Sequence, residues 1–369
     1  MKVALVYDRV NKWGGAERVL LALHEIWPEA PLYTAVYHSQ TAPWASVFKV
    51  IPSFLQNFPL AKKHHELYPW LMPFAFESFN FDEYDVVISV TSEAAKGIIT
   101  KPQTLHLCYC LTPTRYLWSG YEEYFSSSVQ RLASSWLVKY LRNWDKVAAQ
   151  RPDEYLAISQ TVKERIKKYY GRESEVIYPP ISTDKFKIQN SKFKVKKDFF
   201  LVVSRLVKYK RIDLAIEAFN QLGWNLKIAG TGKELKKLQA KASKNIQFLG
   251  QLTDEALLNY YQNCQGLVFP TEEDLGLVPL EAQAMGKPVI AFARGGAVET
   301  VVEGKTGLFF NQQTPGALIE ALRRFKETNF KAEDCRAQAE KFNQVRFARE
   351  FKNVVERKWQ EHLKTISMS

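Results

Sequence analysis

Two carboxylates eight positions apart bracket an apolar run in the segment EEDLGLVPLE (272–281). Glu273 precedes the run and Glu281 closes it, although an apolar run of this kind is normally buried. Pro279 suits the first turn of a helix, where its missing N–H group costs nothing, so we expect a helix to begin near Val278. The acids could merely complement the helix dipole, or both could border a ligand at different points along it.

Backbone amides in the same segment are expected to form an anion-binding site. The first N–H groups of a helix have no partner within the helix and favour a negative charge. Gly276 would let the backbone approach a ligand closely, because it has no Cβ atom. The amides concerned belong to Leu275, Gly276, Leu277 and Val278.

Two basic residues lie in SRLVKYKRIDLAI (204–216), where Arg205 follows an expected strand and Lys210 precedes an expected helix. Both are therefore expected at the carboxyl edge of a sheet, where open α/β sheets bind their ligands. A guanidinium and an ammonium group five positions apart could grip two phosphates. A solvated basic turn is the alternative, and this stretch alone does not decide between them.

Glycines mark two further turns at expected helix starts. In WGGAERVL (13–20), Gly14 and Gly15 could bring backbone amides close to a ligand. The turn AGTGKEL (229–235) has the same character. Paired glycines occur at many helix starts, so neither turn defines a ligand site by itself.

Strands alternate with helices along the chain, which predicts parallel sheets with crossover helices. The first series has expected strands at 2–7, 32–37, 85–90, 104–110 and 155–158, with helices over 16–27, 129–151 and from Ser159 or Thr161 onward. Two prolines and several turn residues end this series at VIYPPISTDKF (176–186). A second series follows, with strands at 199–204, 225–230, 245–250, 266–270 and 288–292 and helices between them.

These series predict two doubly wound, Rossmann-like α/β domains, because 369 residues are too many for one compact core. We expect a first domain over 1–178, a second over 179–345, and a C-terminal helix in 346–369 that crosses back to the first domain. Two such domains would face each other across a cleft lined by the carboxyl edges of their sheets.

Charge and cysteine content narrow the class of protein. The net charge is +12, of which residues 1–150 carry only +1 and the remainder +11. The basic excess after residue 150 favours binding to an anionic ligand or surface. The alternative is that these lysines only make helix faces soluble. No nucleic-acid-binding pattern is present, and no apolar run approaches the roughly 20 residues of a membrane span. The four cysteines lack disulfide or metal spacing, which favours a reducing, cytoplasmic compartment.

Three motifs, in order along the chain, resemble those of glycosyltransferase family 4, the retaining nucleotide-sugar enzymes of GT-B fold. The segment EEDLGLVPLEAQAMGKPVIAFARGGAVETVVEGKTGLFF (272–310) resembles the donor-site signature of the family. SRLVKYKRIDLAIEAF (204–219) resembles its diphosphate grip, and VYDRVNKWGGAERVL resembles its N-terminal glycine loop. Within the family, CYCLTPTRYLW (108–118) and the donor signature are most similar to bacterial mannosyltransferases of O-antigen and other surface polysaccharides.

The resemblance implies a role for each matching residue. Arg205 and Lys210 would bind the donor diphosphate, and Glu281 would hold the ribose hydroxyls. Glu273 would face the transferred sugar and act in catalysis, together with Arg205 and Lys210. The donor-binding set is completed by Gly14, Gly15, Leu275, Gly276 and Leu277. The family requires no metal and no cofactor, because cations and helix amides neutralise the leaving group.

One position departs from the family pattern. Many relatives carry His before the Thr-Pro of the CYCLTPTRYLW segment, where this chain has Leu111. A role carried by that imidazole cannot be transferred, and His106 in the preceding strand is expected to be structural. Arg115 and Tyr116 remain candidates for the acceptor side.

A basic and aromatic stretch, FPLAKKHHELYPWLMPFAFESF (58–79), suggests a peripheral contact with anionic lipid at the inner face of the membrane. A buried loop that covers the sheet is the alternative. Lys62 and Lys63 are the residues expected to contact lipid head groups.

The resemblance implies that the protein transfers a hexose, expected to be mannose from GDP-mannose, to a polysaccharide or lipid-linked saccharide. The base of the nucleotide, the acceptor and the linkage cannot be read from these residues. Two alternatives stay open: another GT-B activity, such as glucosyl transfer or sugar-nucleotide epimerisation, and a catalytically silent protein that only binds a sugar nucleotide.

Overall fold

The computed structural model describes residues 1–125, 127–181 and 198–368. The chain divides into two compact units, Met1–Pro180 together with Val345–Ser369, and Ile181–Gln344. We refer to them as unit 1 and unit 2. Of the predicted break at 176–186, residues 182–186 lie outside the described residues.

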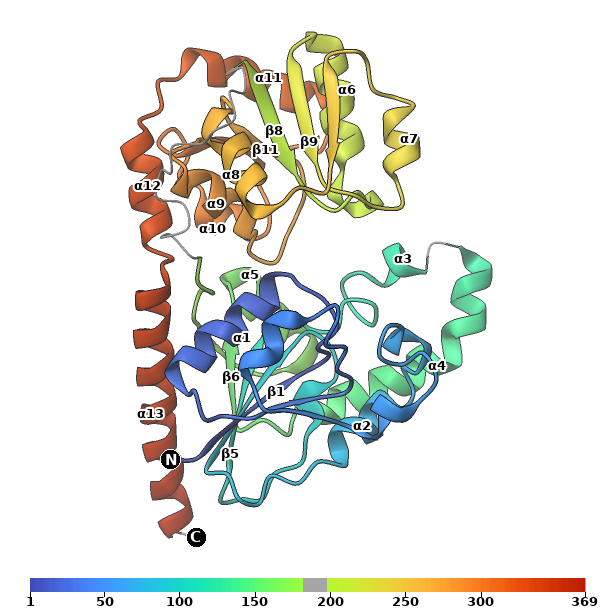
Figure 1. The fold of residues 1–369 in the computed structure, drawn as a ribbon, viewed down its shortest axis with the longest axis vertical. Helices are drawn as coiled ribbons and strands as arrows, with labels where there is room; N and C mark the ends of the chain where they lie inside the picture. The colour runs from blue at the N-terminus through green and yellow to red at the C-terminus, as the bar shows by residue number, and fades with distance from the viewer. Residues whose placement is uncertain (126, 182–197, 369) are drawn as a thin grey trace. The chain divides into compact units, whose positions relative to one another are not determined.

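Unit 1 is built on a parallel sheet, of which Figure 1 labels β1, β5 and β6. The strand order of this sheet is β3-β2-β1-β4-β5-β6-β7. Its central strands are apolar and buried along their whole length, as expected where helices cover both faces of a parallel sheet. The strands are β1 (Val3–Tyr7), β2 (Leu32–Thr34), β3 (Val50–Pro52), β4 (Val86–Thr91), β5 (Leu105–Cys110), β6 (Glu154–Ala157) and β7 (Glu175–Val176).

The helices of unit 1 are α1 (Gly15–Ile26), α2 (Met72–Glu77), α3 (Tyr121–Tyr124), α4 (Ser128–Ala148), α5 (Gln160–Tyr170) and α13 (Gln344–Met368). Helix α5 shows why such a segment begins and ends where it does. The Ser159 hydroxyl accepts a hydrogen bond from the Val162 amide, and Gly171 ends the helix with a left-handed backbone at φ 67°. Ser159, rather than Thr161, is therefore the N-cap.

Helix α13 packs on unit 1 although it follows unit 2 in sequence. Phe351 contacts Trp27 and Tyr109, with ring centroids 6.2 and 5.2 Å apart. Arg357 donates two hydrogen bonds of 2.8 Å to Glu175, the first residue of the edge strand β7. An apolar face and a bidentate ion pair thus hold this helix against the sheet.

Unit 2 contains a second parallel sheet, in the order β10-β9-β8-β11-β12-β13. Its strands are β8 (Phe199–Val203), β9 (Asn225–Ala229), β10 (Ile246–Gly250), β11 (Leu267–Phe269), β12 (Val289–Phe292) and β13 (Gly307–Phe310). Its helices are α6 (Ile212–Leu222), α7 (Leu235–Gln239), α8 (Asp254–Asn263), α9 (Leu277–Ala284), α10 (Ala297–Thr300), α11 (Pro315–Glu327) and α12 (Ala332–Glu340).

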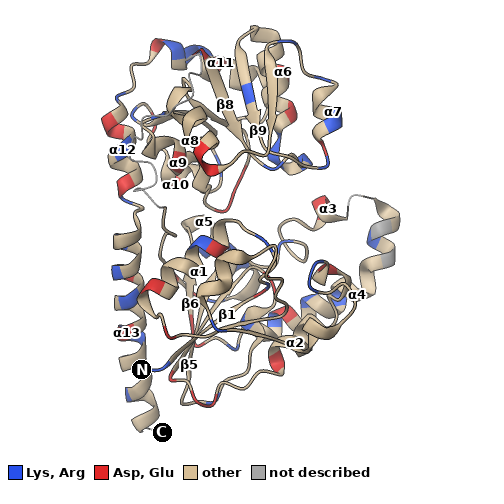
Figure 2. Ribbon diagram, viewed as in Figure 1, with Lys and Arg blue, Asp and Glu red and all other residues tan. Residues whose placement is uncertain are grey.

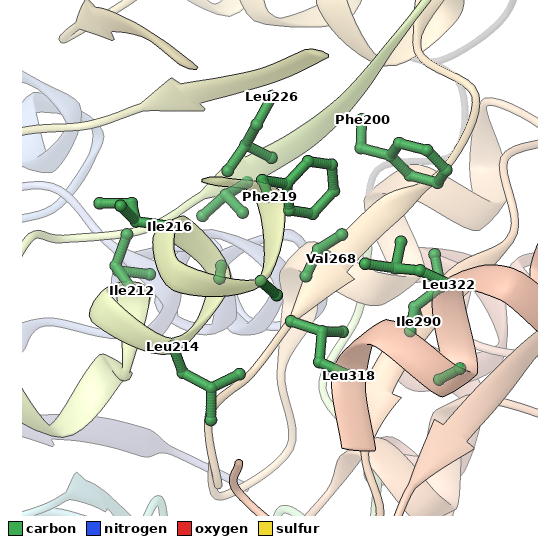
Figure 3. Close-up of a cluster of buried hydrophobic side chains, with 14 of the residues drawn as sticks. Phe200, Ile212, Leu214, Ile216, Phe219, Leu226, Val268, Ile290, Leu318 and Leu322 are labelled. Carbon is green, nitrogen blue, oxygen red and sulfur yellow. The ribbon is translucent and has the colours of Figure 1, made fainter. Parts of the chain in front are cut away.

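Alternation along β8 divides the core of unit 2 into two layers. Phe200 and Val202 face α6 and α11, in the cluster that Figure 3 shows in part. Phe199 and Leu201 face the opposite layer, which contains Tyr261 of α8. Successive side chains of a strand point to opposite faces of the sheet, so one short apolar strand supplies both layers.

The predicted class of two doubly wound α/β domains is confirmed by these two parallel sheets. Strand β13 had not been predicted, because GLFF follows glycine-rich turns and shows no alternation. The stretch 54–81 contains short helices, among them α2, in which Met72 and Phe76 are buried and Phe74 is exposed. Trp70, which precedes α2, is also exposed. No helix among the described residues is long and apolar enough to cross a membrane.

Each sheet has one point where the strand order reverses. In unit 1 the chain turns from β1 toward β2 on one side and later places β4 on the other side. In unit 2, β8 lies between β9 and β11 in the same way. The loops that leave the carboxyl ends of such neighbouring strands diverge, which opens the crevice where α/β proteins bind ligands.

Candidate active site

An ion pair joins the two loops that diverge in unit 2. Lys210 follows β8 and Glu273 follows β11, and the Lys210 ammonium contacts the Glu273 carboxylate. The side chains of Lys210 and Glu273 are 12% and 17% exposed, respectively. The structure thus brings together two predicted site residues that are 63 positions apart in the chain.

Arg205 lies in the same loop as Lys210, and its guanidinium group is exposed. Its Nη2 atom donates a hydrogen bond of 2.6 Å to the hydroxyl of Tyr209. The Lys210 ammonium lies 5.1 Å from the centre of the same tyrosine ring, a favourable cation–π distance. Tyr209 therefore orients both cations, a role that the sequence pattern had not indicated.

Helix α9 begins beside Glu273. Gly276 is its N-cap and has φ 83°, a left-handed conformation that glycine adopts without strain. The loop Leu275–Leu277 thereby leads directly into the first helical turn, whose amides form a site suited to an anion. The helix is eight residues long.

Gly295 and Gly296 allow the backbone that follows β12 to pack closely against the loop of Glu273 and Leu275. A Cβ atom on Gly296 would lie 2.1 Å from the Cα atom of Leu275, and one on Gly295 would lie 2.4 Å from the carbonyl oxygen of Glu273. The Gly296 amide also donates a 2.8 Å hydrogen bond to that oxygen. No side chain fits at either position, so the GG pair of the motif sets the position of Glu273.

The second glycine turn, AGTGKEL (229–235), supports the basic loop in a similar way. A Cβ atom on Gly230 would lie 1.9 Å from the carbonyl oxygen of Ser204, and one on Gly232 would lie 2.2 Å from that of Leu206. The Leu206 amide donates a 2.8 Å hydrogen bond to the Thr231 carbonyl. These glycines thus allow the backbone on either side of Arg205 to pack closely against the turn.

Glu281 is buried on α9 and is only 5% exposed. Its Oε2 atom accepts a 2.9 Å hydrogen bond from the hydroxyl of Tyr261, which lies on α8 and is fully buried. The helix begins at Leu277, one residue before the expected Val278, so Glu281 is its fifth residue and lies beyond the first turn.

Unit 1 also has an ion pair between its diverging loops. Arg9 follows β1 and Glu93 follows β4, and their side chains are 2.7 Å apart. The Nε2 atom of His65 lies 3.9 Å from Glu93. Burial and the charge of Arg9 lower the pKa of His65 to about 4, so the ring is neutral at pH 7. Arg9 Nε is buried without a hydrogen-bond partner among the described residues.

A buried carboxylate fixes the loop that follows β4. Asp8 accepts hydrogen bonds from the Thr91 hydroxyl at 2.8 Å and from the amides of Ser92, Ala94 and Ala95 at 2.7, 2.9 and 2.9 Å. Such bonds satisfy a carboxylate that has no exposed surface. Asp8 therefore positions Glu93 from beneath.

Gly14 and Gly15 lie at the start of α1. Gly14 is the N-cap and has an extended backbone with φ −175°, so its conformation does not itself require glycine. A Cβ atom there would lie 3.0 Å from Oε2 of Glu17. Glu17 is buried and accepts a 2.8 Å hydrogen bond from Tyr7.

Arg115 and Tyr116 lie in the loop after β5. Arg115 is 3.9 Å from Glu123, and the Tyr116 ring contacts Tyr124 with centroids 6.2 Å apart. Leu111, where many relatives carry His, donates its amide to the Thr91 carbonyl at 2.8 Å.

The loop that contains Arg115 is tied to helix α4. Asp145 of α4 accepts hydrogen bonds from the Thr114 hydroxyl at 2.9 Å and from the Trp118 indole at 2.7 Å. The buried ammonium of Lys96 lies 2.5 Å from the same carboxylate. Burial opposes the charge of Lys96, but Asp145 outweighs it and raises the pKa of Lys96.

His106 has the structural role that we expected. It is fully buried and forms a 2.8 Å hydrogen bond with Ser89. Burial lowers its pKa to about 3.

Several residues of these two sites had not been predicted. Arg9 and Glu93 follow strands of unit 1 at the carboxyl edge of its sheet, as Arg205 and Glu273 do in unit 2. That placement could have identified them. Tyr261 has no such signal, because an aromatic residue in an amphipathic helix is normally read as part of the core.

Comparison with known proteins agrees with these features. Residues 183–342 match the family model "Glycosyl transferases group 1". The chain is 27% identical to the D-rhamnosyltransferase WbpZ of Pseudomonas aeruginosa over 214 residues, which cover 55% of each chain. It is 26% identical to the O-antigen chain mannosyltransferase C of Escherichia coli over 198 residues, which cover 50% of this chain and 52% of the relative. It thus spans about half the length of these curated relatives.

A solved structure covers more of the chain. The Anabaena protein HepE in complex with UDP superimposes with a TM-score of 0.72 over 96% of this chain and 100% of HepE, at 20% identity. A likeness at this identity supports the fold alone, and that fold is GT-B. Residues 183–342, less than half of the chain, thus match the group 1 glycosyltransferases, and the fold of the chain is that of GT-B glycosyltransferase structures.

Proposed function

We propose that this protein transfers a hexose from a nucleotide sugar to a saccharide acceptor with retention of configuration. The observation that carries the proposal is the cluster at the strand reversal of unit 2. There Lys210 contacts Glu273, which precedes the start of α9, and Tyr209 contacts both Lys210 and Arg205. Two cations and free helix amides suit a diphosphate, and a carboxylate beside them suits sugar hydroxyl groups.

Each residue has a distinct proposed role. Arg205, Lys210 and the amides of 275–277 stabilise the negative charge that grows on the diphosphate as its bond to the anomeric carbon breaks. Glu273 faces the sugar, which gains positive character in that step. An acceptor hydroxyl then bonds to the anomeric carbon, and its proton passes to the departing diphosphate on a front-face route.

Glu281 is proposed to hold the ribose of the nucleotide. Carboxylates perform the same task in dinucleotide-binding folds. The hydrogen bond from Tyr261 fixes the orientation of the Glu281 carboxylate. Gly14 and Gly15 of unit 1 remain proposed donor-binding residues. Arg115 and Tyr116 are the proposed residues of the acceptor side.

Mannose from GDP-mannose is the proposed donor, and a lipid-linked saccharide is the proposed acceptor. The motif resemblance and the mannosyltransferase of Escherichia coli support mannose, whereas the structural relative from Anabaena was solved with UDP. The two observations point to different bases, so the donor has to be tested directly.

Thermal-shift measurements with GDP-, UDP-, ADP- and dTDP-sugars test the proposal. A ligand that binds only the folded state raises Tm in a concentration-dependent manner. We expect GDP-mannose to raise Tm most, and to lose this effect in Arg205→Ala. A larger Tm shift with a UDP-sugar would show that the donor is a UDP-sugar and would leave the proposed class of reaction unchanged. The absence of a Tm shift with every nucleotide sugar would overturn the proposed function.

A further inference from the structure

Helix α4 exposes an apolar stripe, which the polar Asn143 interrupts between Tyr140 and Val147. Its members recur at intervals of three, four, four and seven residues, which places them on one face of a helix. Three of them are more than two-thirds exposed. They are Val129 (74%), Leu132 (79%), Trp136 (68%), Tyr140 (38%) and Val147 (61%).

The opposite face of α4 is already occupied. Val138 and Leu141 are buried against Leu117 and the aromatic residues around it. Further along, Asp145 forms its ion pair with Lys96. The helix cannot turn its exposed stripe inward without breaking these contacts, so the stripe is available to something outside the chain.

Positive charge borders the stripe. Lys139 and Lys146 are exposed on one flank, and Arg142 is half-buried beside them. Figure 2 shows basic residues recurring along α4. Asp145 is the one acidic residue in this helix, and its charge is compensated by Lys96.

A groove adjoins the same flank. It has a volume of about 360 Å³ and lies between α4 and the aromatic rings of Trp118 and Tyr121. Its cationic lining consists of Lys139, Arg142 and Lys146. The Arg142 guanidinium lies 4.6 Å from the Tyr121 ring centre, which holds this cation at the wall of the groove.

We propose that α4 docks on a membrane surface that contains anionic phospholipid. The stripe would lie among the acyl chains near the head groups, and the groove would receive a lipid phosphate. Amphipathic helices with Trp on the apolar face and Lys or Arg along its border bind interfaces in this way. A second copy of this chain fits less well, because a two-fold pairing of stripes would bring like charges together.

The docking helix is also the helix that holds the acceptor loop. Thr114 and Trp118 are tied to Asp145 on its inner face, so docking would place Arg115 and Tyr116 close to the lipid surface. This consequence rests on the proposed function, whereas the docking itself does not.

Vesicle flotation of the full chain tests the inference. Phosphatidylcholine vesicles with and without phosphatidylglycerol are compared for the wild type, Leu132→Ser/Trp136→Ser and Lys139→Glu/Lys146→Glu. Two matched controls are Lys236→Glu/Lys237→Glu, which makes the same charge change on exposed residues of α7, and Val345→Ser, which removes an exposed apolar side chain from α13.

We expect the wild type and both controls to float only with the anionic vesicles. The Lys139/Lys146 variant should bind at least roughly tenfold more weakly, because each Lys near an anionic surface contributes about a fivefold factor. The Leu132/Trp136 variant should weaken binding by a similar factor. Free phosphate should compete only weakly, since it cannot engage the stripe.

Other outcomes overturn the inference. Equal flotation of all variants would show that α4 is not the docking element. A wild type that does not float but sediments as a dimer, with a monomeric Leu132/Trp136 variant, would assign the stripe to an interface between copies. Unchanged Tm and unchanged donor thermal shifts in the variants exclude misfolding and separate this test from that of the proposed function.

Discussion

Both units place a cation and a carboxylate on opposite sides of the point where the strand order reverses. In unit 1 the pair is Arg9 and Glu93, and in unit 2 it is Lys210 and Glu273. The side chains of all four are between 12% and 21% exposed. The same topology has therefore produced the same kind of ion pair twice.

The surroundings of the two pairs differ. Glu93 is held from below by the buried Asp8 network, and a neutral His65 lies beside it. Glu273 instead lies in a loop that leads through a left-handed glycine into α9, and two further glycines pack against its backbone. An ion pair alone does not make a phosphate site. The second cation, Arg205, and the glycines that pack behind Glu273 distinguish unit 2.

The largest expected effect concerns the cations of unit 2. Arg205→Ala and Lys210→Ala should each lower kcat/KM by roughly 10²–10³-fold, the scale of losing one charged contact to a transition state. Steady-state kinetics with the donor found by thermal shift provides the measurement. Lys208→Ala changes an exposed lysine of the same loop and should stay near wild type. Wild-type kcat/KM in both Arg205→Ala and Lys210→Ala would show that the cations of unit 2 do not bind the donor.

Glu273→Gln should lower kcat by about 10²-fold while donor binding changes only a few-fold. The charge of Glu273 is proposed to matter most when the sugar gains positive character, and only such differential binding changes kcat. Because Glu273 contacts Lys210, the double variant Lys210→Ala/Glu273→Gln should lose less than the sum of the single losses in activation free energy. Strict additivity would show that the two residues act independently.

Glu281→Ala should raise the donor KM by about tenfold and change kcat less, the pattern of lost uniform binding. The ribose is unchanged by the reaction, so its contact has similar strength in the ground and transition states. Tyr261→Phe removes the hydrogen bond that orients this carboxylate and should produce a smaller rise in KM. Calorimetric donor affinity that is identical in wild type and Glu281→Ala would contradict the assignment.

A pH effect is expected from unit 1, which contains all six histidines of the chain. The folded pKa of His65 is about 4 and its ordinary value is 6.5. The unfolded chain therefore binds more protons between these values, and stability is lost as the pH falls from 6.5 toward 4. The full shift corresponds to at most about 3 kcal/mol of unfolding free energy.

Urea unfolding between pH 7 and 4.5 measures this dependence. His65→Gln should make the slope smaller without abolishing it, because His106, whose pKa is about 3, destabilises the folded state over the same pH range. His38→Gln, outside the Arg9 cluster, should keep the wild-type slope. An equally steep slope in His65→Gln would show that other groups control the acid sensitivity.

The smallest effect is expected from the stretch 58–79. Its Lys62 and Lys63 are exposed, but several of its apolar residues, such as Met72 and Phe76, belong to the core of unit 1. Lys62→Glu/Lys63→Glu should reduce vesicle binding only a few-fold, less than the Lys139/Lys146 variant, and leave donor affinity unchanged. A larger loss than that of the α4 variant would make 58–79 the main lipid contact.

Local patterns in the sequence were sufficient to predict the class of fold, and they also led to the proposed donor site. Apolar runs of strand length alternate with amphipathic helices, and this order requires parallel sheets. Arg205, Lys210, Glu273 and Gly276 follow strands or precede helices, so their place at a sheet edge could be derived without coordinates. Whether a residue follows a strand or precedes a helix depends on neighbours within a few positions of the sequence.

Tertiary structure alone decided which of these residues meet. The order of strands brings Lys210 to Glu273 and Arg9 to Glu93, across 63 and 84 positions of the chain. Tertiary packing also places Tyr261 against Glu281. It determines that the face of α4 with Asp145 and Leu141 is buried and that the opposite face remains exposed. Strand pairing and helix packing are set by the burial of apolar surface over the whole unit. The spacing of residues within a short sequence segment therefore does not predict them.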